Sequence, residues 1–167
     1  MPSVPPEPTT PPVPPTPTTP TTPSGEAHSA ARPGGAAADL AAVWAVFTDM
    51  YEAYLSGDRA RIDIHLDPEA TIWDSATPQL LLGKPDLDRI RAGRPTAEGD
   101  GGGPVEAGLT AYDQVIDVFG ELAVCRHWVR VDYHDRPSAL LRNTAVLRRA
   151  DGRWLITHLH EDQQAAG

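Results

Sequence analysis

Apolar and polar residues follow two different periods along this chain of 167 residues. The first is helical: residues 39–58, DLAAVWAVFTDMYEAYLSGD, repeat apolar side chains every three or four positions. The repeating side chains are Val43, Phe47, Met50 or Tyr51, and Tyr54. Asp39 is a suitable N-cap and Ser56-Gly57 a suitable stop. The pattern therefore predicts one long first helix.

Three shorter elements are predicted after this helix. Asp58 can cap a short helix over residues 59–66, RARIDIHL. Residues 70–75, ATIWDS, are rich in strand-forming side chains and predict a strand, which a turn connects to a short LLL strand. A further helix is predicted from Gly83 to Ile90, with a proline acceptable in its first turn.

In the second half of the chain the period changes to two. The segments LTAYDQVIDVF and ELAVCRHWVRVDY predict a hairpin about residues 119–121, and SALLRNTAVLRRADGRWLITHLHED predicts a second one. Helices followed by a long antiparallel meander predict an α+β domain, with the helices on one face of a curved sheet.

Composition divides the chain into further parts. Residues 1–38 are dominated by proline and threonine, which favour extended segments and build no core, so we expect a disordered tail. Residues 93–105, GRPTAEGDGGGPV, predict a glycine-rich loop, either a lid or an insertion. The folded domain is expected over residues 39–163, and residues 164–167 form a short C-terminal tail.

Charge and cysteine content narrow the range of partners. The net charge of −9 disfavours nucleic acid and anionic membrane surfaces. No apolar run approaches the roughly 20 residues that span a bilayer, and the first residues lack the features of a secretory signal. The single cysteine, Cys125, allows no internal disulfide. We therefore expect a cytoplasmic protein.

Four segments resemble one known superfamily. They are the helix end YLSGD, the stretch HLDPEATIWDS, the Gly-Lys-Pro helix start and the terminal hairpin RRADGRWLITHLHED. Over residues 39–163 the chain resembles the nuclear transport factor 2-like superfamily. It is most similar there to SnoaL-like proteins and to the association domain of calcium/calmodulin-dependent protein kinase.

The resemblance implies a cone, in which a strongly bent sheet wraps around helices and opens at one end into an apolar pocket. It also implies a homodimer that forms through the outside of the sheet. It does not imply one activity, because the superfamily contains isomerases, cyclases, dehydratases and domains with no chemistry. Many relatives have a serine at the position of Asp162. A role that depends on the serine hydroxyl is therefore not expected in this chain.

The last strand carries the strongest candidate chemistry. In WLITHLHED, His158 and His160 lie two residues apart and therefore share a strand face. A type I turn with a bulge, which the flanking pattern favours, pairs His158 with Thr144 and His160 with Arg142. That face is apolar at the turn, where Trp154 lies, and polar away from it, as a binding pocket requires.

A second register stays open for the same hairpin. A two-residue turn on Asp151-Gly152 would pair the two histidines with Ala145 and Asn143 instead. On the strand AVCRHWVRVDY the more apolar face carries Cys125 and His127, so we expect His127 to point inward as a third pocket histidine.

The residue types indicate proton-transfer chemistry. An imidazole near its ordinary pKa of about 6.5 exchanges protons at neutral pH, and Asp74 or Asp113 can orient it. His158, His160 and Asp74 are the candidate catalytic residues, with Arg142 or Tyr112 to stabilise an oxyanion. Two alternatives stay open. The histidines form only buried hydrogen bonds or dimer contacts, or the pocket binds without chemistry.

Aromatic side chains indicate the class of ligand. Tyr54, Trp73 and Trp154 are candidates to line the pocket, which favours a small apolar polyketide-, steroid- or aromatic-like molecule. No third ligand accompanies the His-x-His pair, so we expect no metal, and no motif indicates another cofactor. The chain is therefore predicted to be a small-molecule pocket protein, with a cofactor-independent isomerase, cyclase or dehydratase as its catalytic form. The alternative is a non-catalytic association module.

Overall fold

Helices precede most strands in the computed structural model, which describes residues 34–75, 77–93 and 106–164. The elements are α1 (Ala37–Leu55), α2 (Arg59–Asp63), β1 (Leu66–Trp73), β2 (Leu81–Leu82), α3 (Gly83–Gly93), β3 (Glu106–Phe119), β4 (Leu122–Tyr133), β5 (Ala139–Ala150) and β6 (Arg153–Gln163). The predicted α+β class is confirmed. The predictions for most of the N-terminal tail, the glycine-rich loop and the last residues lie outside the described residues.

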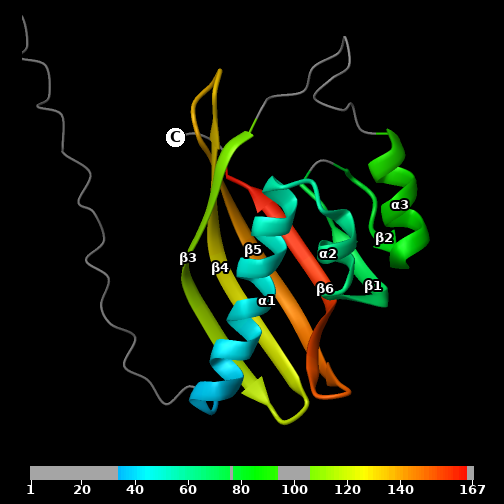
Figure 1. Cartoon of the computed structure of the whole chain (residues 1–167), viewed down its shortest axis with the longest axis vertical. Helices are drawn as coiled ribbons and strands as arrows, with labels where there is room; N and C mark the ends of the chain where they lie inside the picture. The colour runs from blue at the N-terminus through cyan, green and yellow to red at the C-terminus, as the bar shows by residue number, and fades with distance from the viewer. Residues whose placement is uncertain (1–33, 76, 94–105, 165–167) are drawn as a thin grey trace, which may run out of the picture. The chain divides into compact units, whose positions relative to one another are not determined.

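The six strands form one open, strongly bent sheet in the order β2-β1-β6-β5-β4-β3, and α1 crosses it diagonally (Figure 1). Strands β3 to β6 make the predicted antiparallel meander. One pairing was not predicted: β1 runs parallel to β6, and the backbone N–H of Ile156 donates to the carbonyl of His65 at 2.9 Å. This pairing brings the first strand of the domain beside the last.

Helix α1 buries one side against the sheet. Four of its buried residues pack on core residues of β3 to β6: Val43, Val46, Phe47 and Met50. Ala53, one turn further on, is also buried. The sequence predicted Asp39 as the N-cap, and this prediction is wrong. The helix begins two residues earlier, and Asp39 lies in the first turn, where its carboxylate pairs with Arg149. A carboxylate in this turn is favourable because the helix dipole is positive there.

The final hairpin corrects the favoured register. Asp151 and Gly152 both have positive φ, 50° and 75°, which defines a two-residue type I′ turn that pairs Ala150 with Arg153. The register then shifts by one residue between the pairs Leu147–Ile156 and Val146–His158.

Thr157 is the extra residue of this bulge. Its hydroxyl donates to the carbonyl of Val146 at 3.1 Å. The bulge pairs His160 with Thr144, whereas the favoured prediction paired it with Arg142 and the alternative with Asn143. The favoured register is therefore wrong throughout. The alternative register is correct from the turn to the pair Leu147–Ile156 and wrong beyond the bulge, because it assumed an unbroken ladder.

We call the face of the sheet that the helices cover the inner face and the opposite one the outer face. The inner face carries Ile156 and Leu159 of β6, which pack in the core with α1 and α3. The bulge leaves His158, between Thr157 and Leu159, on the outer face. The sequence-based prediction that Cys125 and His127 point inward is confirmed, since both are buried.

Candidate functional site

Three polar side chains lie side by side on the inner face, one on each of three neighbouring strands. His127 of β4 is paired with Asn143 of β5, and Asn143 with Glu161 of β6. His127 and Asn143 are buried, with 4% and 2% of their surfaces exposed. Tyr51 of α1 completes the set, which we call the polar row, because its hydroxyl lies 2.7 Å from Nε2 of His127.

Burial keeps the α1 end of the row uncharged. Burial lowers the pKa of His127 to about 4, so its imidazole is neutral at pH 7. Burial, together with the charge of Glu161, raises the pKa of Tyr51 well above its usual value, so the phenol keeps its proton. With the phenol donating to Nε2, the ring proton of His127 lies on Nδ1, 3.6 Å from Sγ of Cys125. Burial also raises the pKa of this thiol to about 12. The row can donate hydrogen bonds here without carrying charge.

The other end of the row is acidic. Glu161 is half-buried, and its Oε1 accepts a hydrogen bond of 3.1 Å from the hydroxyl of Ser75. Asp74, which the sequence predicted to be catalytic, immediately precedes Ser75 at the end of β1. Asp74 is therefore the chain neighbour of the residue that hydrogen-bonds Glu161, and its predicted catalytic role stays a prediction.

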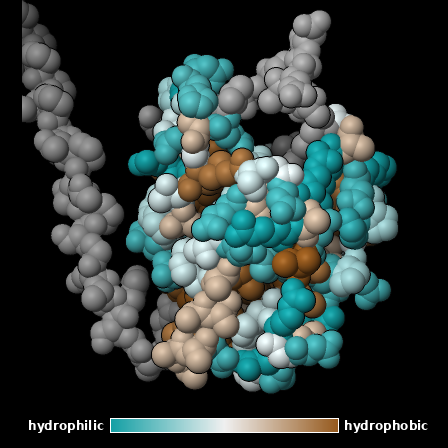
Figure 2. Space-filling view, viewed as in Figure 1, coloured by the Kyte–Doolittle hydropathy of each residue, from teal (hydrophilic) through white to brown (hydrophobic). Residues whose placement is uncertain are grey.

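Beyond the polar row the inner face becomes apolar. Val129, Val131 and Leu141 form a buried cluster, against which Leu109 and Tyr51 pack. Figure 1 shows β3, β4 and β5 continuing past the C-terminal end of α1. In the same view, Figure 2 shows apolar surface over the strands beside that end of the helix. An apolar floor with a few polar groups at one edge is typical of small-molecule sites.

His158 and His160, on which the predicted catalytic site was based, lie on the outer face. Nδ1 of His158 is 2.8 Å from the hydroxyl of Thr71, and the ring of Trp73 contacts both His158 and His160 edge-on, with centroids 6.1 and 5.6 Å apart. We call these four residues the outer patch. The histidines do not meet the polar row, and their predicted catalytic role stays a prediction.

Three more predicted residues also belong to the outer face. Thr144 is paired with His160, and the guanidinium of Arg142 is paired with the carboxylate of Asp162. Tyr112 is paired with Trp128, which lies on the polar side of β4 as the sequence predicted. A break in register next to Tyr112, with φ of 54° at Asp113, ends the regular alternation of β3 there.

The remaining predicted residues are spread over the inner side. His127 is part of the polar row. Trp154 is buried in the core near the hairpin turn, where the guanidinium of Arg149 stacks on its ring at 4.6 Å. Tyr54 lies in the last turn of α1 with 46% of its surface exposed. Of the predicted set, only His127 therefore belongs to the polar row.

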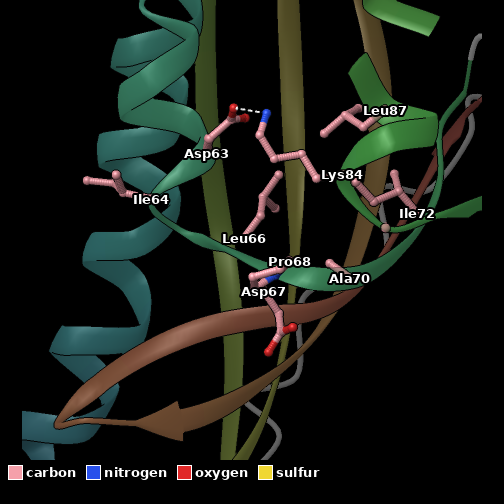
Figure 3. A pocket seen from close by; sticks show the side chains of 10 residues that line it. Asp63, Ile64, Leu66, Asp67, Pro68, Ala70, Ile72, Lys84 and Leu87 are labelled. Atoms are coloured by element: carbon pink, nitrogen blue, oxygen red, sulfur yellow. Dashed lines mark hydrogen bonds and ion pairs between the residues drawn. The ribbon is translucent and has the colours of Figure 1, made fainter. Parts of the chain in front are cut away.

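A small separate pocket of about 200 Å³ lies between α2, β1 and α3 (Figure 3). Leu66, Ile72 and Leu87 make its apolar wall, and Nζ of Lys84 bonds Oδ2 of Asp63 at its rim at 2.6 Å. Figure 2 shows apolar surface at this position below α2. The volume is below the roughly 300–1,000 Å³ of pockets for drug-sized ligands, and no predicted site residue lines it.

Three polar-row residues, Tyr51, Asn143 and Glu161, were absent from the predicted site. Asn143 appeared in the sequence analysis only as a pairing partner in the alternative register, and Glu161 was not considered. Strand pairing could have indicated Asn143 and Glu161, because residues directly opposite each other in an antiparallel ladder share a face. Once His127 is placed inward, the ladder carries that face to Asn143 and then to Glu161.

An open, bent sheet with helices on its inner face and a polar row beside an apolar floor defines a class of small α+β domains. The family model of the SnoaL-like domain matches residues 43–162. The chain belongs to this family. No curated protein sequence matches it.

Solved structures with the same fold have different descriptions. A CaMKII hub from S. rosetta is 20% identical, with a TM-score of 0.61, over 74% of this chain and 95% of that one. A putative ketosteroid isomerase from Shewanella frigidimarina is 20% identical, with a TM-score of 0.57, over 72% and 94%. A putative dehydratase of the NTF2-like family from Streptomyces avermitilis is 18% identical, with a TM-score of 0.59, over 77% and 98%. At these identities the likeness shows the fold alone.

In the described part of the chain, no helix is long and apolar enough to cross a membrane. In the same residues, no group of three or more His, Cys, Asp or Glu side chains is placed to hold a metal ion.

Proposed function

We propose that the domain binds a small apolar molecule, of polyketide-, steroid- or aromatic-like shape, on the inner face beyond α1. The observation that carries this proposal is the polar row itself. A neutral phenol–imidazole pair, held at 2.7 Å beside a buried amide, borders an apolar floor. Apolar contacts would supply affinity for such a ligand, and the row would orient its polar group.

Proton-transfer chemistry is the further step of this proposal. A carboxylate of Asp74 or Glu161 would take a proton next to a carbonyl. The Tyr51 hydroxyl would donate to the developing oxyanion, and His127, in the tautomer with its proton on Nε2, would then donate to the phenol oxygen. These roles fit an isomerisation, cyclisation or dehydration that needs no cofactor. The similarity to structures described as a ketosteroid isomerase and a dehydratase supports this class of reaction.

The binding test uses a charge placed on the apolar floor. Leu109 is half-buried on β3 opposite Val131, so Leu109→Glu puts a carboxylate in the proposed site with little disturbance of the core. We expect at least a tenfold loss of affinity for a planar fluorescent steroid, measured by titration of the full chain; tenfold corresponds to about 1.4 kcal/mol.

Two control variants locate the site. Leu140→Glu adds the same charge at a position with 41% exposure, opposite Arg130 on the outer face. His160→Ala removes an outer-patch imidazole. Both should bind the steroid as the parent does. Equal binding by Leu109→Glu, or a loss in His160→Ala, would place the ligand away from the inner face.

The outer patch favours a second candidate function. Trp73 has 45% of its surface exposed beside two imidazoles, although large aromatic residues are usually buried. The similarity to a hub domain supports an association module, in which this face meets a second copy of the chain. Light scattering that reports a monomer at micromolar concentration would exclude it.

A further inference from the structure

Asn143 is the most unusual residue of the polar row. Its residue surface is 2% exposed, and neither Nδ2 nor Oδ1 has a hydrogen-bond partner among the described residues. A buried amide without partners loses its hydration and gains nothing in return. A leucine, whose side chain has the same number of heavy atoms and the same branching, would avoid this loss. A bound molecule is therefore the candidate hydrogen-bond partner for the Asn143 amide.

Its neighbours define what that partner must be. On the β4 side lies His127, which is neutral and engaged with Tyr51. On the β6 side lies Glu161, a carboxylate. An anionic ligand group would lie beside this carboxylate, and two negative charges at this distance repel each other. A neutral oxygen, in contrast, can accept from Nδ2 and, if it is a hydroxyl, donate to Oδ1.

We propose that Asn143 is the residue that selects the polar group of the ligand, and that this group is a neutral carbonyl or hydroxyl oxygen and not a carboxylate. The inference rests on the proposed function, because it assumes that a ligand occupies the inner face. It narrows the ligand to neutral apolar molecules that carry an oxygen. It also predicts that the unpartnered amide of Asn143 lowers the stability of the ligand-free protein.

The test compares four probes of one shape: naphthalene, acetylnaphthalene, naphthol and naphthoate. At pH 7 the first three are neutral and the last is an anion. We expect the full chain to bind acetylnaphthalene and naphthol about tenfold more tightly than naphthalene, since a buried hydrogen bond contributes on this scale. Naphthoate should bind at least tenfold more weakly than acetylnaphthalene.

The variant Asn143→Leu separates ligand selection from a structural role. It should bind all three neutral probes equally, which abolishes the tenfold preference. Without ligand it should melt about 4 °C higher than the parent, because an unpartnered amide has been replaced by an apolar side chain. A residue with a purely structural hydrogen bond would give the opposite result, a lower melting temperature and an unchanged preference. Thr144→Val, the adjacent exposed position on β5, is the matched control and should change neither quantity.

The outcomes distinguish this inference from the proposed function. If the neutral probes bind equally to the parent, or if Asn143→Leu keeps the preference, the selecting role of Asn143 is wrong while apolar binding stands. If naphthoate binds best, the ligand is an acid and the inference is also overturned. If no probe binds below millimolar concentration, both the inference and the proposed function fail.

Discussion

The two faces of this sheet carry the same kinds of side chain in opposite environments. On the inner face His127 is buried, lies beside Tyr51 and is neutral at pH 7. On the outer face His158 and His160 border the half-exposed ring of Trp73. An imidazole and an aromatic ring therefore do not define a site by themselves. Burial and the partner of each ring nitrogen decide what the group can do.

A single residue separates the two environments on β6. Without the bulge at Thr157, strict alternation from Ile156 would send His158 and His160 inward and Leu159 outward. The bulge reverses that assignment for the rest of the strand. The candidate chemistry of the last strand thus depends on one extra backbone position and not on its side-chain pattern.

The largest expected effect comes from a charge placed on the inward side of this strand. Leu159→Asp puts a carboxylate at a position that packs against the core, whereas His160→Asp puts the same group at an exposed position. For Leu159→Asp we expect a loss of at least about 4 kcal/mol in the free energy of unfolding, measured in urea, because it combines lost burial with an unpaired charge on the inner face. His160→Asp is the control and should have a small effect. Equal losses in both variants would show that the bulge does not determine the faces.

A smaller effect should distinguish the histidines by their response to acid. The folded-state pKa of His127 is about 4, below the ordinary 6.5, so the unfolded chain binds a proton more readily between these values. Neutral His127 therefore makes its full contribution to the free energy of unfolding above pH 6.5. This contribution falls by about 3 kcal/mol as the pH decreases towards 4. His127→Gln should flatten this part of the pH dependence in chemical denaturation. His160→Gln, which changes an exposed ring, should leave it as it is in the parent.

The smallest expected effect is on the outer face. Arg142 and Asp162 form an ion pair whose side chains are 57% and 45% exposed. The hydrogen bond from Arg142 lowers the pKa of Asp162, but water screens an ion pair at this exposure. Arg142→Ala should therefore leave the urea midpoint unchanged within error. A clear loss would mean that a second copy of the chain buries this pair.

Most elements of this fold could be predicted from local patterns. The helical repeat of α1 and the alternation of β4 were sufficient because one face of each element is apolar enough to be recognised. The inward direction of His127 followed from the same alternation. The cap at Asp58 was also correct, since its carboxylate accepts from the N–H of Arg61 at 3.0 Å.

The rest depends on contacts that a local pattern does not contain. The bulge at Thr157 is an offset of one residue in a ladder, and both registers in the sequence analysis lacked it. The start of α1 at Ala37 has no side-chain cap to mark it. The pairing of β1 with β6 joins residues far apart in the chain. For this reason the predicted site contained His158 and His160, whereas the structure assembles Tyr51, Asn143 and Glu161 around His127.

The parallel pairing of β1 with β6 has a consequence for the order of folding. Thr71 is hydrogen-bonded to His158 across 87 positions of the chain, so on a ribosome the first strand emerges long before its neighbour exists. Closing so large a loop is slow, and the antiparallel hairpins of the second half can form earlier. We expect β1 amides to gain protection from hydrogen exchange last during refolding; protection of β1 before β5 would contradict this order. Until then, the apolar underside of β1 is a surface that a nascent chain must shield from aggregation.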